Sequence, residues 1–363
     1  MAAMGFIRRN IFIIVVAVLI AGLHGLAAAQ TASEGARFVI GGQFAFPEEG
    51  AYVIERMQEE GGAYSTLALP QGRTLHVLDF HAYPGVRLVY AGTRVGMENA
   101  TQLSVLMATL PEEYRPDVVV HSGIAGNAGP GLIGDIYLHR FFVLANLGTM
   151  YGAGFDPRLN DAYNPATGQL EQHMYFPAHP TLIELGEEAF AAYRERPAVQ
   201  ALVDAIRPEG EPLRLLTGYV GASSNWFVAS SEVVERWQLL YGIRPRRARA
   251  TITYPGEAFY PQVGASYPLG TVDMETAAAA KTFFEFGIPF AAARYPSDSA
   301  RELAREEIEA YWLHAAEIGG RFVWEWILAI AAYVQDGGEF APAQPLKSDS
   351  LWTDRGREVR RAP

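Results

Sequence analysis

Residues Gly270–Asp298 read GTVDMETAAAAKTFFEFGIPFAAARYPSD, and this stretch decides the predicted fold. Its alanine-rich part, Asp273–Phe286, is typical of a helix, and Gly287 is a common helix stop. The apolar run Ile288–Arg294 that follows is typical of a buried strand. The stretch therefore predicts a helix that leads directly into a strand, with acidic residues at both outer ends.

The lengths of this helix and this strand match. The helix would be roughly 21 Å long at ~1.5 Å per residue, and the strand roughly 23 Å long at ~3.3 Å per residue. If the strand packs back along the helix, Glu275 and Asp298 become neighbours at the edge of the sheet where ligands bind in open α/β folds. A purely structural role is the alternative, in which each acid only stabilises a helix N-terminus.

Strands and helices alternate along the chain, which predicts an α/β fold: a single domain with a central twisted mixed β-sheet flanked by helices. A long insertion of irregular structure is expected in the stretch rich in Asn, Pro, Gly and Tyr, residues 145–180. Strands are predicted in 37–44, in a hairpin around Pro84 and Gly85, in 116–138 on both sides of a glycine-rich loop, and in 213–223. Helices are predicted in 47–60, 96–110, 181–195 and 232–242. Residues 300–334 are predicted to form one long helix or a broken pair.

The first 29 residues differ from the rest in composition. Arg8 and Arg9 precede an apolar run, and small residues follow at Ala27–Ala29, a pattern typical of a cleavable signal peptide over residues 1–29. The apolar run is shorter than the roughly 20 residues that a membrane-spanning helix needs. We therefore predict a periplasmic or secreted protein, with a retained N-terminal anchor as the alternative and with Sec and twin-arginine export both open.

Behind the signal peptide, residues 37–335 are predicted to form the folded domain. Residues 336–363 carry Pro and mixed charges and are predicted to be a polar, disordered tail. The net charge of −11 would become −13 once Arg8 and Arg9 are removed. This acidic balance argues against a nucleic-acid partner and against binding to a membrane after signal cleavage.

The chain has no cysteine, which excludes disulfides, thiolate metal sites and a cysteine nucleophile. His139, His173 and His179 lack the spacing of metal ligands and are read as polar loop residues. We therefore expect neither a metal nor an organic cofactor.

Five blocks of sequence carry a family resemblance. They are FAFPEEG at 44–50, RVGMENA at 94–100, SGIAGNAGPGLIGDI at 122–136, ASSNWFVAS at 222–230, and VDMETAAAA with GIPFAAARYPSD within 272–298. In this order they resemble the nucleoside phosphorylase superfamily, in particular its methylthioadenosine/S-adenosylhomocysteine nucleosidases. The glycine-rich block and the long insertion also look similar to plant bark and vegetative storage proteins. The resemblance implies that fold, a small-molecule purine nucleoside as ligand, and a homo-oligomer.

The resemblance also implies roles for individual residues. Asp298 would protonate the purine as it leaves, and Glu49 would activate the attacking water. Arg294 and Ser297 would steady that water and Asp298. The implied substrate-binding residues are Glu275 and Met274 at the ribose, Phe227 and Val228 at the base, and Ile124 and Gly126 in the glycine-rich loop, which has a simple tight turn as its alternative role.

The residue types suit this chemistry independently of the family. Cleavage of an N-glycosidic bond gives the sugar cationic character, which carboxylates stabilise, and the purine leaves more easily when an acid protonates it. A phosphorylase, the second alternative, needs cations for phosphate, whereas the first turn holds Glu48 and Glu49, and His121 stands near the usual arginine position. Arg94 is the one basic candidate.

A non-catalytic binding or storage protein is the third alternative. Two departures from the family pattern bear on it. Ile124 stands where many relatives have a hydroxyl residue, and Tyr295 and Pro296 are bulkier than the usual small pair before Ser297.

Overall fold

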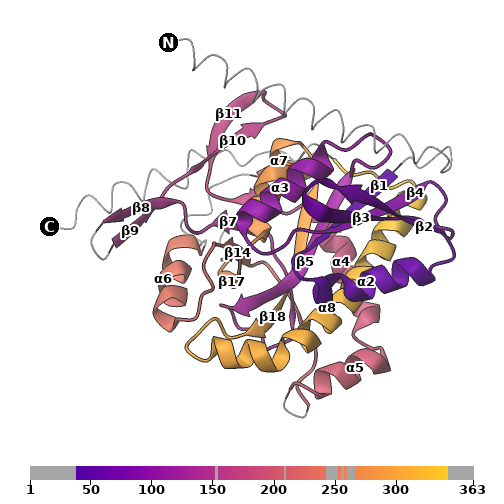
Figure 1. Ribbon diagram of the computed structural model, residues 1–363. Coiled ribbons are helices and arrows are strands. Elements are labelled where there is room, and N and C mark those ends of the chain that lie inside the picture. The colour runs from indigo at the N-terminus through magenta and orange to yellow at the C-terminus, as the bar shows by residue number, and fades with distance from the viewer. Residues whose placement is uncertain are drawn as a thin grey trace, which may run out of the picture.

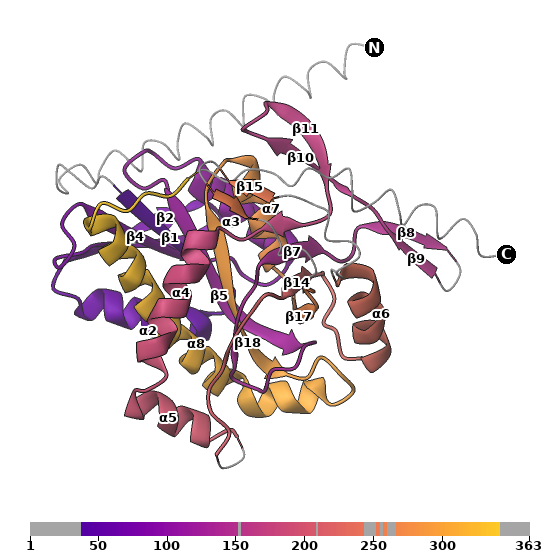
Figure 2. The same cartoon turned by 180° about the vertical axis from the view of Figure 1, so that it is seen from behind.

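The computed structural model describes residues 38–151, 154–207, 210–242, 252–254, 257–259 and 266–341. The predicted signal peptide, residues 1–29, and residues 342–363 of the predicted tail lie outside these ranges. Within them, the predicted α/β domain with a mixed sheet flanked by helices is confirmed (Figures 1 and 2).

A mixed sheet of 12 strands forms the centre of the described domain. The strands are β1 (Phe38–Phe44), β2 (Ala63–Leu69), β3 (Arg73–Asp79), β4 (Val86–Gly92), β5 (Val118–Asn127), β6 (Ile136–Leu138), β7 (Phe141–Leu144), β12 (Phe176–Pro177), β13 (Leu215–Thr217), β14 (Val220–Ser223), β17 (Leu269–Asp273) and β18 (Phe290–Asp298). The main path runs β12-β7-β14-β17-β5-β1-β4-β3-β2, while β18 pairs with β5 and β6, and β6 pairs with β13.

Strand β5 connects the parts of this sheet. It pairs in parallel with β1 and β18, and it pairs antiparallel with β17 near its end. Both β5 and β18 are buried along nearly their whole length. Continuous burial of this kind is typical of central strands that are covered on both faces.

Two groups of helices flank the sheet (Figure 2). Helix α8 packs against α2 and α4 and against strands β5 and β18, whereas α7 packs against α3 and against strands β7 and β14. The described helices are α2 (Pro47–Glu59), α3 (Met97–Ala108), α4 (Pro180–Tyr193), α5 (Pro197–Asp204), α6 (Ser231–Tyr241), α7 (Thr276–Glu285) and α8 (Ala304–Gln335), with a short 3₁₀ turn at Pro70–Gly72.

Most predicted elements are confirmed, including the hairpin β3–β4, the end of α6 at Gly242, and a single unbroken α8. Two boundaries in the opening stretch were predicted wrongly. Helix α7 begins at Thr276 rather than Asp273, because the Asp273 carboxylate caps it and belongs to strand β17. Strand β18 continues to Asp298 rather than ending at Arg294, because pairing with β5 holds it in the sheet.

Two predicted loops also contain strands. The glycine-rich segment is extended up to Asn127, because neighbouring strands on both sides of β5 fix its backbone despite the glycines. The insertion 145–180 was predicted to be irregular but forms two hairpins, β8–β9 (Gly148–Tyr151, Gly154–Pro157) and β10–β11 (Asn160–Asn164, Gln169–His173). A further small hairpin joins β15 (Ile252–Tyr254) and β16 (Glu257–Phe259).

The first residues of the predicted tail lie against the domain. The ring of Phe340 is 5.8 Å from that of Phe38 and 5.3 Å from that of Tyr333. The carbonyl oxygen of Ala341 lies 2.9 Å from His179 Nε2. Residues 338–341 therefore include contacts with the domain beyond the end of α8.

Among the described helices, none combines the length and the apolar character that a membrane crossing requires.

Candidate active site

A pocket of about 550 Å³, including its mouth, opens where several chain segments end together. Its lining includes three of the predicted carboxylates, Glu49, Glu275 and Asp298. The other lining residues are Phe46, Val95, Ile124, Ala125, Gly126, Trp226, Phe227, Val228, Val272, Asp273, Met274, Ser297 and Ile308. All predicted site residues except Arg294 therefore face one cavity.

The register of the sheet explains why Glu275 and Asp298 meet. Gly126, near the end of β5, is paired with Val272 of β17 on one side and with Asp298 of β18 on the other. A Cβ atom on Gly126 would lie 3.0 Å from Asp298 Oδ1 and 2.7 Å from the Ala300 side chain. Because Gly126 has no side chain, the carboxyl group of Asp298 has room at this edge of the sheet.

Glu49 is fixed by the start of helix α2. One carboxylate oxygen accepts from the amides of Ala45 at 2.7 Å and Phe46 at 2.9 Å, and the other accepts from the Ile124 amide at 2.8 Å. Burial raises the pKa of Glu49, although Arg294 and the three amides oppose the rise. The result is an immobilised carboxylate that binds a proton more readily than an exposed one.

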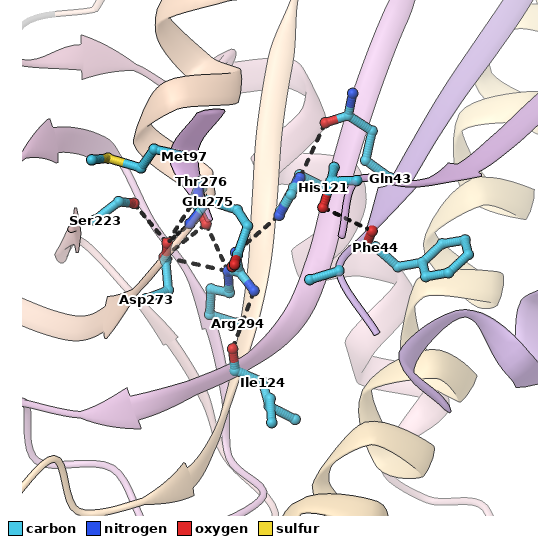
Figure 3. Close-up of polar contacts among 12 residues, drawn as sticks. Gln43, Phe44, Met97, His121, Ile124, Ser223, Asp273, Glu275, Thr276 and Arg294 are labelled. Carbon is cyan, nitrogen blue, oxygen red and sulfur yellow. Dashed lines mark hydrogen bonds and ion pairs between the residues drawn. The ribbon is translucent and has the colours of Figure 1, made fainter. Parts of the chain in front are cut away.

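Arg294 lies fully buried behind the pocket wall and connects the acidic side chains (Figure 3). It does not line the cavity, so the structure does not place it where it could contact a bound water directly. Its guanidinium donates to Thr276 Oγ1 at 2.6 Å, the Ile124 carbonyl at 3.1 Å, His121 Nε2 at 2.9 Å and Glu275 Oε2 at 3.2 Å.

His121 is neutral in this arrangement. Because its Nε2 accepts from Arg294, its proton is on Nδ1, which lies 3.2 Å from Gln43 Oε1. Burial and then the positive charge of Arg294 lower the pKa of His121 well below its usual value. His121 therefore orients Arg294 without adding a second positive charge (Figure 3).

Asp273 is a positioning residue that the sequence analysis missed, because it was read as the first residue of a helix. Its Oδ1 accepts from Ser223 Oγ at 2.6 Å and from the amides of Glu275 and Thr276, each at 2.9 Å. Burial alone would raise the pKa of Asp273, but Arg294 and these hydrogen bonds lower it. This charged cap fixes the backbone that presents Glu275.

The side chain of Glu275 is only 4% exposed. It lies between two hydrogen-bond donors. Its Oε1 accepts from the Gly96 amide at 3.0 Å and its Oε2 accepts from Arg294. Burial raises the pKa of Glu275 to about 7, with Asp273 adding to the rise and Arg294 opposing it.

Asp298 differs from Glu275 in its surroundings. It accepts from the Ala300 amide at 2.8 Å and from Ser297 Oγ at 3.0 Å, and no arginine contacts it within the described residues. Burial raises the pKa of Asp298 to about 6, while these two hydrogen bonds oppose the rise. A carboxyl group with such a pKa can hold a proton close to neutral pH, as a general acid must.

Glycine is needed at position 123 because Glu49 and Arg294 both approach strand β5 at this point. A Cβ atom there would lie 2.4 Å from Arg294 Nη1 and 2.8 Å from Glu49 Oε1. Any side chain at this position would displace one of these groups.

The aromatic wall of the pocket is exposed at its mouth. Phe227 is 50% exposed and Trp226 is 62% exposed, while Val228 is buried. Asn225 ties this loop to helix α3, since its Oδ1 accepts from the Met97 amide at 3.1 Å. Sequence reasoning found Phe227 and Val228 but missed Trp226, Phe46, Val95 and Ile308, since single apolar residues in loops and helix ends carry no distinct signal.

Arg94, the one basic candidate for binding a phosphate nucleophile, does not line the pocket. Its Nη2 donates to the Gln71 carbonyl at 2.8 Å, and the side chain is exposed.

The three histidines that were read as polar loop residues are buried instead. His139 stacks on Tyr137 and its Nε2 lies 3.0 Å from Thr271 Oγ1, and burial lowers the pKa of His139 to about 3. Within the part of the chain that the structure describes, no group of acidic, histidine or cysteine side chains could hold a metal ion.

The sequence profile described as the phosphorylase superfamily matches residues 53–327, and the chain belongs to that superfamily. The resemblance drawn from the five blocks is thereby confirmed. No curated protein sequence matches the chain.

Solved structures with the same fold include several enzymes. The futalosine hydrolase of Helicobacter pylori strain 26695 has a TM-score of 0.56 at 19% identity, over 80% of this chain and 97% of that one. The 5′-methylthioadenosine/S-adenosylhomocysteine nucleosidase of Neisseria meningitidis, in complex with methylthio-immucillin-A, has a TM-score of 0.55 at 21% identity, over 80% and 98%. The corresponding nucleosidase of Helicobacter pylori has a TM-score of 0.56 at 19% identity, over 81% and 99%. These likenesses show the fold.

Proposed function

We propose that this protein is a nucleosidase that hydrolyses the N-glycosidic bond of adenosine-type purine nucleosides. The observation that carries the proposal is one pocket whose buried carboxylates include Glu49, Glu275 and Asp298 in different surroundings, beside the exposed ring of Phe227. Sugar, leaving base and nucleophile each need a separate polar group in this reaction, and the pocket offers one for each.

The proposed binding mode follows from these side chains. The purine stacks on Phe227, with the backbone of Val228 at the edge of the base. Glu275, beside Met274, accepts hydrogen bonds from the two ribose hydroxyls. Arg294 acts from behind the wall as a positioning residue, since it holds Glu275 and the Ile124 carbonyl in place.

In the reaction, the bond between C1′ and the purine N9 breaks and its electron pair moves onto the base. Asp298 gives its proton to N7 of that base, and Ser297 orients the carboxyl group. Glu49 takes a proton from the water whose oxygen bonds to C1′. The products are the free base and the free sugar, and both carboxyl groups return to their starting state by exchange with solvent.

The charge of the pocket favours water over phosphate as nucleophile. Four carboxylates line it, Glu49, Asp273, Glu275 and Asp298, and no lysine or arginine does so among the described residues. Each carboxylate that is about 4 Å from a phosphate oxygen would cost roughly 4 kcal/mol at an effective dielectric constant near 20.

Three further apolar side chains line the pocket. Phe46, Val95 and Ile308 line it without an assigned role at the base or at the ribose hydroxyls. An apolar 5′ substituent such as a thioether would bury its surface against these side chains. This feature supports a 5′-modified adenosine over plain adenosine as the preferred substrate.

Chromatography of free base tests the proposal. Purified protein is incubated with methylthioadenosine, adenosine and inosine, each with and without phosphate. We expect adenine and free methylthioribose without phosphate. Strict dependence on phosphate would contradict hydrolysis, and tight binding without release would favour the storage role.

We further propose that residues 1–29 direct export and that the mature protein is a homo-oligomer. Fractionation of cells that express the full chain tests the first point, because retention in the cytoplasm would refute it. Light scattering on the purified protein tests the second, because a mass near that of one mature chain would refute it.

A further inference from the structure

The loop that carries the proposed base site, residues 225–230 (the base loop), is loosely packed in its middle. Trp226, Phe227 and Val228 line the pocket, and they also line a second cavity of about 1000 Å³, including its mouth. The rings of Trp226 and Phe227 are at least half exposed. Segments with few buried contacts have little local stability of their own. The position of these side chains therefore depends on how the two ends of the base loop are held.

The first end of the base loop is tied to helix α3. Asn225 accepts a hydrogen bond from the Met97 amide, and its Nδ2 donates to Glu98 Oε1 at 2.7 Å. The Gly96 amide, directly before these residues in sequence, donates to Glu275. This end is therefore held by the same turn that holds the proposed ribose ligand.

The second end is held by a carboxylate from another part of the chain. The amide of Ser231 donates to Glu302 Oε1 at 2.9 Å, and its hydroxyl donates to Glu302 Oε2 at 2.6 Å. Ser231 is the first residue of α6, so its amide has no acceptor within the helix. Glu302 lies in the segment between β18 and α8, beside α6, and caps that helix (Figures 1 and 2). A negative charge is also favourable at a helix N-terminus.

The same segment holds the proposed acid. The Ala300 amide donates to Asp298 Oδ1 at 2.8 Å, and the Ala300 carbonyl accepts from the Ser230 amide at 3.1 Å. Ala300 is fully buried and has a φ of 53°, a left-handed conformation that is uncommon for alanine. Such a conformation persists only where the surrounding structure imposes it. One residue thus joins the base loop to the carboxyl group that would protonate the base.

We propose that Glu302 is a positioning residue: by capping α6, it holds the base loop against Ala300 and so keeps the bound base aligned with Asp298. Glu302 does not line the pocket, so it acts through these two segments rather than by touching the ligand. The inference rests on the proposed function, because that function assigns the base to Phe227 and the proton to Asp298.

Glu302 is ionised wherever Asp298 titrates. Hydrogen bonds, above all the two from Ser231, lower the pKa of Glu302 to about 2, whereas burial raises the pKa of Asp298 to about 6. The cap therefore stays the same over the pH range of the test. The charged groups around Asp298 also stay in place when Glu302 is replaced; they include Glu307 on α8, Arg301 next to Glu302, and Glu49, Asp273 and Glu275 in the pocket.

The pH–rate profile of Glu302→Ala tests the inference. Without the cap, the Ala300 amide should bond less firmly to Asp298. Because this bond lowers the pKa of Asp298, the alkaline limb should move to higher pH by roughly half a unit, part of the effect of one hydrogen bond. Loss of a nearby negative charge alone would move the limb to lower pH. At pH 5, kcat/KM should fall about tenfold, because the base and the acid are less well aligned.

Two further variants complete the comparison. Glu302→Gln keeps one acceptor oxygen for Ser231 and should restore part of the lost kcat/KM. Glu306→Ala removes an exposed acid from the first turn of α8 and should leave both the limb and kcat/KM in place. Because Glu302 is exposed, its variants should fold as the parent protein does, and urea unfolding checks this.

Hydrogen exchange of backbone amides tests the same contact without substrate. In Glu302→Ala, peptides that cover residues 225–231 and 299–303 should both lose protection relative to the parent protein. The inference would be overturned by an alkaline limb that stays in place or moves to lower pH. Exchange that is unchanged, or that is faster in α6 alone, would overturn it as well. If the parent protein releases no base, the proposed function fails, and the exchange of residues 299–303 then decides alone whether Glu302 holds this segment.

Discussion

Replacing Glu275 by glutamine is expected to stabilise the folded protein at alkaline pH while it weakens catalysis. Burial raises the pKa of Glu275 from 4.5 to about 7. Because the folded state binds this proton more tightly than the unfolded state, the contribution of Glu275 to stability is fully present below pH 4.5 and is lost as the pH rises through 7. This rise in the pKa corresponds to a loss of about 3 kcal/mol in the free energy of unfolding above pH 7.

Glutamine resembles the protonated acid and carries no charge at any pH. The variant should therefore gain about 3 kcal/mol over the parent protein at pH 8, but less than about 1 kcal/mol at pH 5, where the folded parent already holds the proton. Urea unfolding followed by tryptophan fluorescence at both pH values measures this difference. Adenine release should fall in the same variant, because the ribose loses an ionised acceptor.

The control for this experiment is Glu235→Gln on the exposed face of α6, which should change stability by less than about 0.5 kcal/mol at both pH values. The reasoning would be refuted by an equal gain at pH 5 and pH 8, or by a loss at pH 8. Either result would mean that the buried charge of Glu275 is not the source of the cost.

Three further predictions concern the pocket. Gly123→Ala places a Cβ atom 2.4 Å from Arg294 Nη1 and 2.8 Å from Glu49 Oε1, so kcat/KM should fall at least about a hundredfold; unchanged kinetics would refute the close approach. Activity should decline as the pH rises past about 6, where Asp298 loses its proton, and Ser297→Ala should move this alkaline limb to higher pH because it removes the bond that lowers the pKa; an unmoved limb in the pH–rate profile would contradict this. Phe227→Ala should weaken ligand binding by roughly tenfold through lost stacking, as measured by titration, and an unchanged dissociation constant would exclude the ring from the base site.

The meeting of Glu275 and Asp298 at one pocket could be predicted from local sequence, because a strand that packs back along the preceding helix returns the chain to its starting edge. The equal lengths behind that prediction were wrong, since α7 has 10 residues and β18 has 9. The assignment of Glu49 to the same pocket depended on family resemblance, since no local pattern relates it to residues that are over 200 positions away. The boundaries at Asp273 and Asp298 were less predictable. They are set by a side-chain cap and by strand pairing, and neither is visible in a short window of sequence.

Long-range polar contacts account for most of what the sequence did not reveal. The orientation of Arg294 depends on His121, 173 positions away, and the cap of α7 depends on Ser223, 50 positions from Asp273. In the insertion 145–180, strand β10 has alternating burial, but the composition of the insertion is that of a loop.

The central claim is that Asp298 protonates the leaving purine while Glu49 activates water. It is tested most directly by comparing two substrates in the Asp298→Asn variant: methylthioadenosine, whose base must be protonated, and p-nitrophenyl riboside, whose leaving group needs no acid. We predict that adenine release falls by roughly a hundredfold or more, that nitrophenol release is largely retained, and that Glu49→Gln loses both. Equal losses on the two substrates in Asp298→Asn would contradict the account.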